Sequence, residues 1–444
     1  MTIARRLALP AALAAFAWLA APGQARETAP LTLDAHIDIA TDFDREGAPA
    51  TGEGKTQFDL AQARRGGLDA AALAIFAPQQ AETAETLAQA RAVAERKYAI
   101  ISGLADRYPA AAGLARTPAA LRSIVQSGRF AIVEGVVNGG AFVDDVADLD
   151  RWAARGIAFF GFVHAGHNRL ADSSRPALVR GEGASRHGGL SPLGREAVAR
   201  LNLLGIVIDI SQLSDAAADQ VLALSSAPVI ASHSDVRALV ESGRNLTDDQ
   251  LDRLKANHGV IALNAFSAYL RPHDAAIEAR LAALRGEFGL DDARTILPAD
   301  KAAEYDKRYH AIRATEPKAD LDALIAAVDH VVRRIGIDHV ALSSDFNHGG
   351  GVIGWQSVAG TGNVTAALRA HGYSAADIDK IWSGNLLRVW QAAIDQGAKL
   401  RAQGGTPAHA EELREISGPI QKIVKPSRCG ADVGTAGPSA ETRA

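Results

Sequence analysis

The sequence predicts an α/β protein built as a (β/α)8 TIM barrel, and three observations predict it. Short, almost continuously apolar runs recur along the chain, as is typical of strands that are covered on both faces. A helix-like stretch follows most of them, and alternating strands and helices imply a parallel sheet. About eight such units follow one another without a break in composition, which favours a closed barrel over an open sheet.

The expected strands and helices alternate through most of the chain. The strands are expected at Leu31–Ile39, Leu68–Phe76, Phe130–Val136, Ala158–His164, Ile206–Ile210, Val229–His233, Val260–Ala265 and Val340–Phe346. Helical patterns are found at Glu82–Asp106, Pro192–Leu204, Asp215–Leu224, Asp248–Ala256 and Leu321–Ile335. The alternative is a doubly wound open sheet, but no glycine-rich dinucleotide-binding turn follows the first expected strand.

The barrel domain is expected to span residues 26–400, after an N-terminal signal peptide. Arg5 and Arg6 precede the apolar run Leu7–Ala21, and small residues follow it, so cleavage is expected at the end of residues 1–25. The protein is therefore expected to be exported, to the periplasm or the medium, with no membrane span in its mature form. The alternative for this segment is an uncleaved anchor, although the run is short for a membrane span.

Two further segments depart from the alternating pattern. Residues 267–320, between the seventh and eighth expected strands, are charged and helical and are expected to form an insertion in the barrel. Residues 401–444 are rich in Gly, Pro, Ala and Ser and are expected to form a flexible tail. The tail contains the only cysteine, Cys429, so an intrachain disulfide is impossible.

Composition and charge exclude some classes of partner. The chain is 48% hydrophobic and 22% charged, which is enough apolar material for a large buried core. Its formal net charge is −4, whereas a nucleic-acid-binding protein would show a basic surplus. No nucleic-acid partner is therefore expected.

Polar side chains, most of them acidic or imidazole, recur where the expected strands end. In a barrel of this type the chemistry lies at the C-terminal ends of the strands, so these side chains should meet at one mouth. Any one of them alone could be a cap or a satisfied core group, but several polar groups buried together are costly unless they are paired or bind a metal. The side chains concerned are His36 and Asp38, Glu134, His164, Asp209 and Gln212, His233, Asn264, and Asp345.

The residue types suit a metal-dependent hydrolase. Imidazole and carboxylate ligands are typical of zinc and related ions. His36 and Asp38 lie two residues apart on one strand, so their side chains point to the same face. A carboxylate such as Glu134 can bridge two metal ions, and a bound water that has lost its proton can attack a carbonyl group.

The order of motifs resembles the membrane (renal) dipeptidase family, peptidase family M19, within the amidohydrolase-like metal-dependent hydrolases. The resemblance covers about residues 31–395. It is carried by Asp34-Ala35-His36-Ile37-Asp38, Glu134-Gly135, His164 with Asn168 and Ala171-Asp172-Ser173, Gly189-Leu190-Ser191-Pro192-Leu193-Gly194, Asn202-Leu203-Leu204-Gly205, Asp209-Ile210-Ser211, Pro228-Val229-Ile230-Ala231-Ser232-His233-Ser234, Arg244-Asn245 with Asp248-Asp249, Ser344-Asp345-Phe346, and Gly384-Asn385-Leu386 with Arg388-Val389.

The resemblance implies a ligand set for one or two zinc ions. His36 and Asp38 would hold one zinc, Glu134 would bridge to a second, and His233 would bind the second. The family has a histidine as the other ligand of the second zinc, where this chain has Gln212. An amide oxygen is a weaker zinc ligand than an imidazole, so this departure puts the second metal site in doubt.

The resemblance also implies roles toward the substrate. His164 would contact the substrate and polarise the scissile carbonyl or its oxyanion. Arg244 would bind the C-terminal carboxylate, to which a planar guanidinium is suited. Asp345 would carry the proton from the attacking water to the leaving amine.

The resulting expectation is a zinc-dependent dipeptidase that acts on small peptides, including those with a C-terminal D-residue. The resemblance also makes a homodimer an expected state. Two alternatives stay open from the sequence. One is a specialised exported hydrolase that matures a secreted peptide metabolite, and the other is a non-catalytic binding barrel with a degraded metal site.

Overall fold

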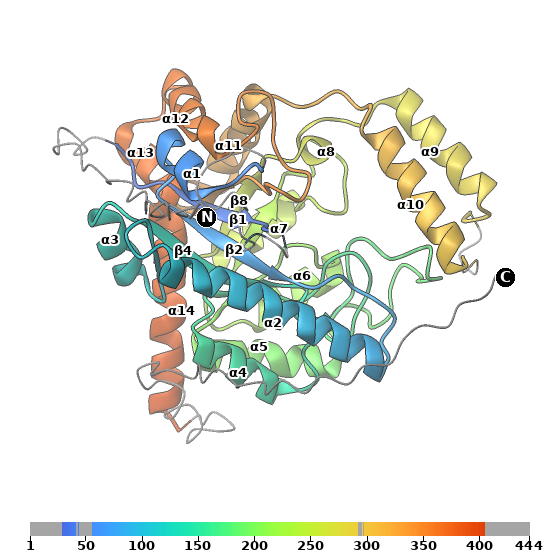
Figure 1. The fold of residues 1–444 in the computed structure, drawn as a ribbon, viewed down its shortest axis with the longest axis horizontal. Coiled ribbons are helices and arrows are strands. Elements are labelled where there is room, and N and C mark those ends of the chain that lie inside the picture. The colour runs from blue at the N-terminus through green and yellow to red at the C-terminus, as the bar shows by residue number, and fades with distance from the viewer. Residues whose placement is uncertain (1–28, 41–42, 44–55, 292–294, 296, 405–444) are drawn as a thin grey trace, which may run out of the picture.

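The computed structural model describes residues 29–40, 43, 56–291, 295 and 297–404 (Figure 1). The expected signal peptide, Cys429 and most of the expected tail lie outside these residues. Among the residues that the structure describes, none of the helices combines the length and the hydropathy that a membrane span requires.

Eight parallel strands form the barrel, as the sequence predicts. They are β1 (Leu33–Ile37), β2 (Ala70–Phe76), β4 (Phe130–Val137), β5 (Phe159–Gly161), β6 (Val207–Asp209), β7 (Ile230–Ser234), β8 (Val260–Asn264) and β9 (Val340–Ser343), paired in that order. A short strand, β3 (Ala112–Leu114), was not predicted and pairs with β4 beside this path. The ring closes at the mouth, where the Asp345 amide donates to the His36 carbonyl (3.1 Å) and the Asp38 amide donates to the Phe346 carbonyl (3.0 Å).

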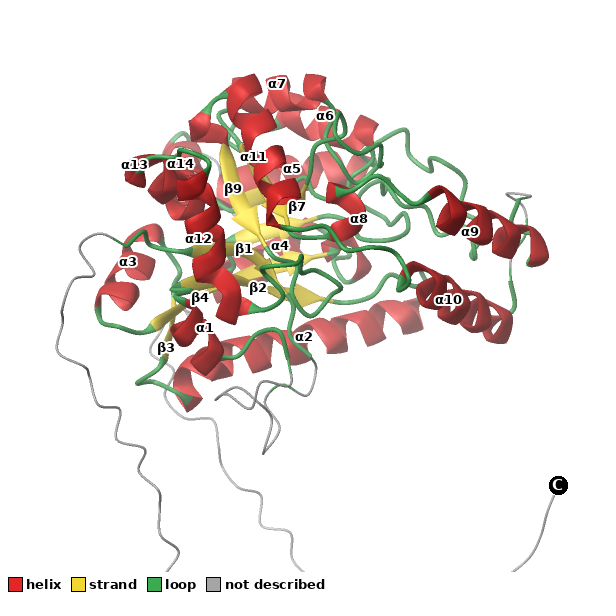
Figure 2. Ribbon diagram, turned by 90° about the horizontal axis from the view of Figure 1, so that it is seen from above, coloured by secondary structure: helices red, strands yellow, loops and turns green. Residues whose placement is uncertain are grey.

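Helices surround the strands (Figure 2). They are α1 (Leu60–Gly66), α2 (Ala84–Arg107), α3 (Pro118–Gln126), α4 (Val146–Arg155), α5 (Pro192–Leu204), α6 (Asp215–Leu224), α7 (Asp248–Ala256), α8 (Ser267–Leu270), α9 (Ala275–Glu287), α10 (Ala299–Arg313), α11 (Leu321–Ile335), α12 (Thr361–Ala370), α13 (Ala375–Asp379) and α14 (Asn385–Ala402). The five predicted helices correspond to α2, α5, α6, α7 and α11. Helices α1, α3, α4, α12, α13 and α14 are not among them, although Thr117 and Asp145 cap α3 and α4 as N-terminal residues of this type usually do.

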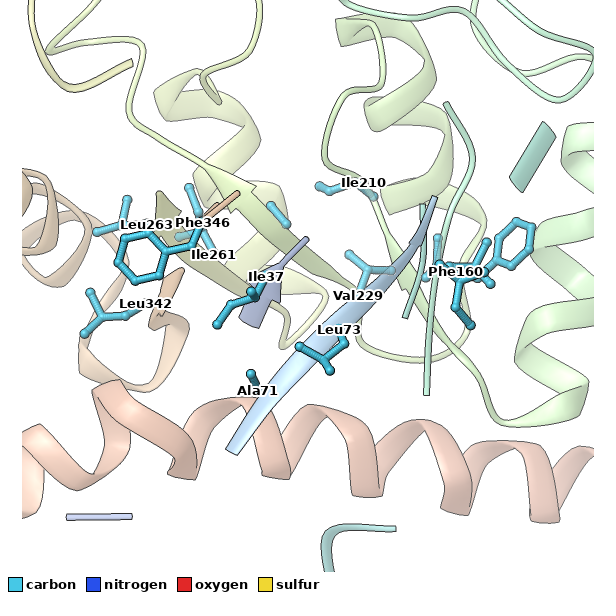
Figure 3. Packing of buried hydrophobic residues seen from close by; sticks show 14 of the residues in the cluster. Ile37, Ala71, Leu73, Phe160, Ile210, Val229, Ile261, Leu263, Leu342 and Phe346 are labelled. Carbon is cyan, nitrogen blue, oxygen red and sulfur yellow. The ribbon is translucent and has the colours of Figure 1, made fainter. Parts of the chain in front are cut away.

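The strands separate two apolar layers. Small inward-facing side chains such as Ala72, Ala131 and Ala262 fill the barrel. Outward-facing side chains pack under the helices, and Figure 3 shows several of them, including Leu73 and Ile261. The inner layer continues into α14, whose Trp390 ring lies 5.9 Å from the Phe159 ring, so this helix covers part of the inner core.

The described part of residues 267–320 is helical, as its composition predicts. Helices α9 and α10 lie side by side and project from the barrel in both overall views (Figures 1 and 2). A separate apolar cluster that includes Leu284, Leu290 and Tyr305 holds them together. Helix α14 ends at Ala402, slightly beyond the predicted end of the domain at residue 400.

Buried aspartates connect neighbouring strands close to the mouth. Asp34 accepts from the amides of His36 (3.1 Å) and Ser344 (3.0 Å), and thus ties β1 to the end of β9. Asp209 accepts from the amides of Ser211 and Ser232, both at 2.9 Å, and ties β6 to β7. Because a carboxylate accepts several hydrogen bonds at once, these side chains fix the strand ends that carry the site.

Candidate active site

The strand ends bring two clusters of polar side chains together. The acidic half consists of His36 and Asp38 from β1 and Asp345 after β9. The basic half consists of His164, Arg175, Gln212, His233 and Arg244 from the segments at the ends of β5, β6 and β7. The rings of His36 and His233 stack with centroids 4.1 Å apart, so the two halves adjoin.

The acidic half has the donor set of a metal site. Nε2 of His36 lies 3.1 Å from Oδ2 of Asp38 and 3.8 Å from Oδ1 of Asp345, and all three residues are buried. One ligand atom from each residue can be chosen so that all lie within 4.8 Å of one another. An imidazole and two carboxylates are ligands that zinc and related ions accept, so these residues fit a metal ion.

The electrostatics of the acidic half favour a cation. Burial would lower the pKa of His36, but the hydrogen bond and charge of Asp38, with the charges of Asp345 and Asp209, raise it to about 9. Burial would raise the pKa of Asp38, yet the hydrogen bond and charge of His36 hold it below its usual value. A cluster that attracts a proton so strongly also attracts a metal cation in its place.

Asp345 is held in one orientation. Its Oδ2 accepts from the Asn264 amide group (3.1 Å), which leaves Oδ1 on the side of His36. Its backbone has a positive φ of 54°, which is uncommon for a residue with a side chain. The hydrogen bond from its amide to His36 and one from the Gly350 amide to its carbonyl (3.0 Å) hold this conformation.

A chain of hydrogen bonds links the side chains of the basic half across the segments at the ends of β5, β6 and β7. Ser232 donates to Asp209, so its oxygen accepts from Nδ1 of His233 (2.7 Å). Nε2 of His233 then accepts from the Gln212 amide group (3.0 Å), and the Gln212 oxygen accepts from Nη2 of Arg175 (2.9 Å). A guanidinium only donates, so Arg175 fixes the orientation of the Gln212 amide.

Two arginines give this half its charge. Nη2 of Arg175 lies 3.3 Å from Nε2 of His164. Arg244 is 3% exposed, donates to the His233 carbonyl (2.8 Å) and lies with its guanidinium carbon 5.1 Å from the centre of the Tyr269 ring. Burial and then the charge of Arg175 place the pKa of His164 well below its usual value, and burial followed by the charges of His36 and Arg244 does the same for His233.

The expectation that Glu134 bridges two metal ions is wrong in this structure. Side chains alternate along β4, and Gly135 rather than Glu134 faces the space near His36 and Asp209. Glu134 points to the helix side, where it accepts from Ser102 of α2 (2.6 Å). Burial raises its pKa to about 7, because only Ser102 and more distant arginines compensate the lost hydration.

The residues expected around a second metal ion do not fit one as they stand. The lone pair of His233 accepts a hydrogen bond from Gln212, and the oxygen of Gln212 accepts one from Arg175. With Glu134 directed elsewhere, no carboxylate of the expected set reaches this half. The structure therefore brings His36, Asp38 and Asp345 together as one site and His164, His233 and Arg244 as a neighbouring site of different character.

Sequence reasoning missed two residues of the mouth. Arg175 gave no signal beyond its place in a long segment between β5 and α5. His348 follows Asp345 closely, and its Nδ1 lies 3.8 Å from Oδ2 of Asp38. Its ring also packs edge-on against His164, with centroids 5.1 Å apart. Proximity to Asp345 in the sequence was the available signal for His348.

Comparisons with known proteins give the same family that the order of motifs resembles. The family model for membrane dipeptidase, peptidase family M19, matches residues 25–404. The chain is 32% identical over 247 residues to Dipeptidase tcpJ of Claviceps purpurea; the match covers 55% of this chain and 46% of that enzyme, so the chain spans about half the enzyme's length.

Two solved structures are similar over most of the chain. The probable dipeptidase PvdM from Pseudomonas aeruginosa is 42% identical, with a TM-score of 0.80, and the match covers 83% of this chain and 96% of that one. A metallo peptidase from Rhodobacter sphaeroides, liganded with a phosphinate mimic of the dipeptide L-Ala-D-Ala, is 25% identical, with a TM-score of 0.62. That match covers 82% of this chain and 99% of the other.

Proposed function

Because the chain belongs to the membrane dipeptidase family, peptidase family M19, we propose that it hydrolyses the peptide bond of dipeptides with a free C-terminal carboxylate. One observation supports this proposal most directly. A buried group with metal-ligand chemistry adjoins a buried arginine, Arg244, for which the structure gives no ion pair among the described residues. Such a pair of sites suits a short substrate with a carbonyl at one end and an anion at the other.

His36 and Asp38 would hold the metal. When bound, a zinc ion lowers the pKa of a coordinated water and polarises a carbonyl group. Oδ1 of Asp345 would accept the proton of the attacking water and deliver it to the leaving amine, while Asn264 keeps the carboxylate in place. The imidazole of His164 would donate a hydrogen bond to the scissile carbonyl oxygen of the substrate and so polarise the carbonyl group.

Arg244 would bind the substrate's carboxylate. Its guanidinium is fixed by the hydrogen bond to the His233 carbonyl and by the face of Tyr269. A substrate carboxylate would supply the counter-charge of a buried cation, which makes the interaction strong. The dipeptide mimic bound by the Rhodobacter sphaeroides relative supports substrates with a C-terminal D-residue as members of the test panel.

The test is amino-acid release from L,L- and L,D-dipeptides by the mature protein, with and without zinc. Metal-dependent release that disappears in Asp38→Asn is expected. Glu134→Gln is the matched control, because it alters a buried carboxylate that faces away from the mouth, and it should keep activity. If a metal-loaded protein releases nothing from any dipeptide, the dipeptidase proposal fails, and a specialised amide substrate or a binding role takes its place.

We also propose that the protein is exported. The basic pair Arg5 and Arg6, the apolar run Leu7–Ala21 and the small residues after it support this proposal. Fractionation of cells that express the full chain tests it, and N-terminal sequencing of the mature protein should give a start near residue 26.

A further inference from the structure

The basic half holds a fixed positive charge at the place where a second metal ion was expected. The guanidinium of Arg175 contacts Gln212 and His164, two of the side chains that surround this place. The structure gives Arg175 no ion pair with a carboxylate among the residues it describes, and its Nε is buried without a hydrogen-bond partner.

Backbone hydrogen bonds hold Arg175 in position. Its amide donates to Oγ of Ser173 (3.1 Å), and its carbonyl accepts from the Gly166 amide (2.7 Å). The amide of the preceding residue, Ser174, donates to the Gln212 carbonyl (2.8 Å). The segment that carries Arg175 is therefore joined to the segment that carries Gln212, and this keeps the two side chains within reach of each other.

The same contacts occupy the lone pairs that a second metal ion would need. Nε2 of His233 accepts from Gln212, and the Gln212 oxygen accepts from Nη2 of Arg175. A second dication at this place would have to displace these hydrogen bonds and would repel the guanidinium. The neighbouring acidic half has the opposite character, because its two carboxylates lie against a single imidazole.

We propose that Arg175 takes the place of the second metal ion, so that the mouth holds one metal ion, at His36 and Asp38, beside a permanent guanidinium charge. The anion that balances Arg175 comes from the bound ligand, as a carboxylate or a polarised carbonyl oxygen. This inference concerns the metal content of the chain and does not depend on whether dipeptides are the substrate.

The experiment counts zinc ions per chain by native mass spectrometry and elemental analysis after chelation and reloading. The wild-type protein is expected to bind one ion. Asp38→Asn should bind none, whereas His273→Ala should still bind one. The second variant is needed because His273, Glu278 and Glu316 form another group with metal-ligand spacing, into which Arg313 already donates.

A double variant tests the role of Arg175. Arg175→Ala with Gln212→His removes the guanidinium and supplies a third imidazole beside His164 and His233, so it should bind two ions. Histidine tolerates the positive φ of 74° at position 212 better than most residues. The matched control is Arg180→Ala with Gln212→His, because Arg180 belongs to the same loop but pairs with Glu182. It should still bind one ion.

Two ions, or none, in the wild-type protein would overturn the proposal. It would also be overturned if the Arg175 double variant, folded by circular dichroism, bound a single ion like its control. If that variant does not fold, the wild-type count still decides between one ion and two.

Discussion

His36 and His233 are the same residue type, and their rings stack with centroids 4.1 Å apart. Their surroundings nevertheless shift their pKa values in opposite directions. The carboxylates of Asp38 and Asp345 raise the pKa of His36 to about 9 against the effect of burial. Burial, with the charges of His36 and Arg244, places the pKa of His233 well below its usual value. Two histidines at one barrel mouth are therefore not two equivalent metal ligands.

Charged side chains at the strand ends and in the loops therefore give the two halves of the mouth opposite character. The half that holds two carboxylates stabilises a cation, and the half that holds Arg175 and Arg244 stabilises an anion. A dipeptide has a carbonyl to be attacked and a carboxylate a few bonds away, and it would lie across both halves. Variants that change one half only should therefore affect separate steps.

The largest effect is expected from Asp345→Asn in the acidic half. The amide keeps the shape of the side chain and a partner for Asn264 but cannot accept the proton of the attacking water. The value of kcat should fall by about 10²- to 10⁴-fold with little change in KM. Steady-state kinetics and a metal count on the same preparation measure both properties. Loss of the metal from this variant would show that Asp345 is a ligand rather than the proton carrier.

A smaller effect is expected from Arg244→Ala in the basic half. Hydrogen bonds to charged groups contribute about 1.5–3 kcal/mol, so kcat/KM should fall by roughly 10- to 150-fold. The fall should appear mainly as a higher KM, with the metal retained. The wild-type enzyme should show a similar fall in kcat/KM when the dipeptide is amidated at its C-terminus. On these amidated substrates Arg244→Ala should lower kcat/KM only slightly further. Equal losses on free and amidated substrates would contradict contact between Arg244 and the carboxylate.

The barrel could be predicted from the sequence because its signals are local. Buried parallel strands produce continuous apolar runs such as Ile206–Ile210, and caps such as Ser191 before Pro192 mark where helices begin. His36, Asp38 and Asp345 could be placed at one mouth for the same reason, since they lie at or directly after the ends of parallel strands.

The remaining part of the site depends on information that strand ends do not contain. Glu134 precedes the end of β4 at Val137, and a shift of one residue along a strand moves a side chain to the opposite face. Arg175 lies in an irregular segment whose path is set by contacts with Gln212 and Gly166. Periodicity predicts neither the face of a single residue near a strand end nor the course of a long loop.

Glu134→Gln gives the last comparison, between a carboxylate inside the acidic half and one outside it. Metal content and activity should not change, because Glu134 faces Ser102 of α2. Its pKa rises from 4.5 to about 7 in the folded protein, so the folded state binds its proton more tightly than the unfolded state. The wild type should lose stability relative to the variant as pH rises from about 4.5 to 7, by an amount of the order of a few kcal/mol. Above pH 7 the difference should stay constant. Denaturant unfolding of both proteins at pH 5 and pH 8 measures it. If Glu134 instead bridged two metal ions, Glu134→Gln would lose metal and activity at every pH.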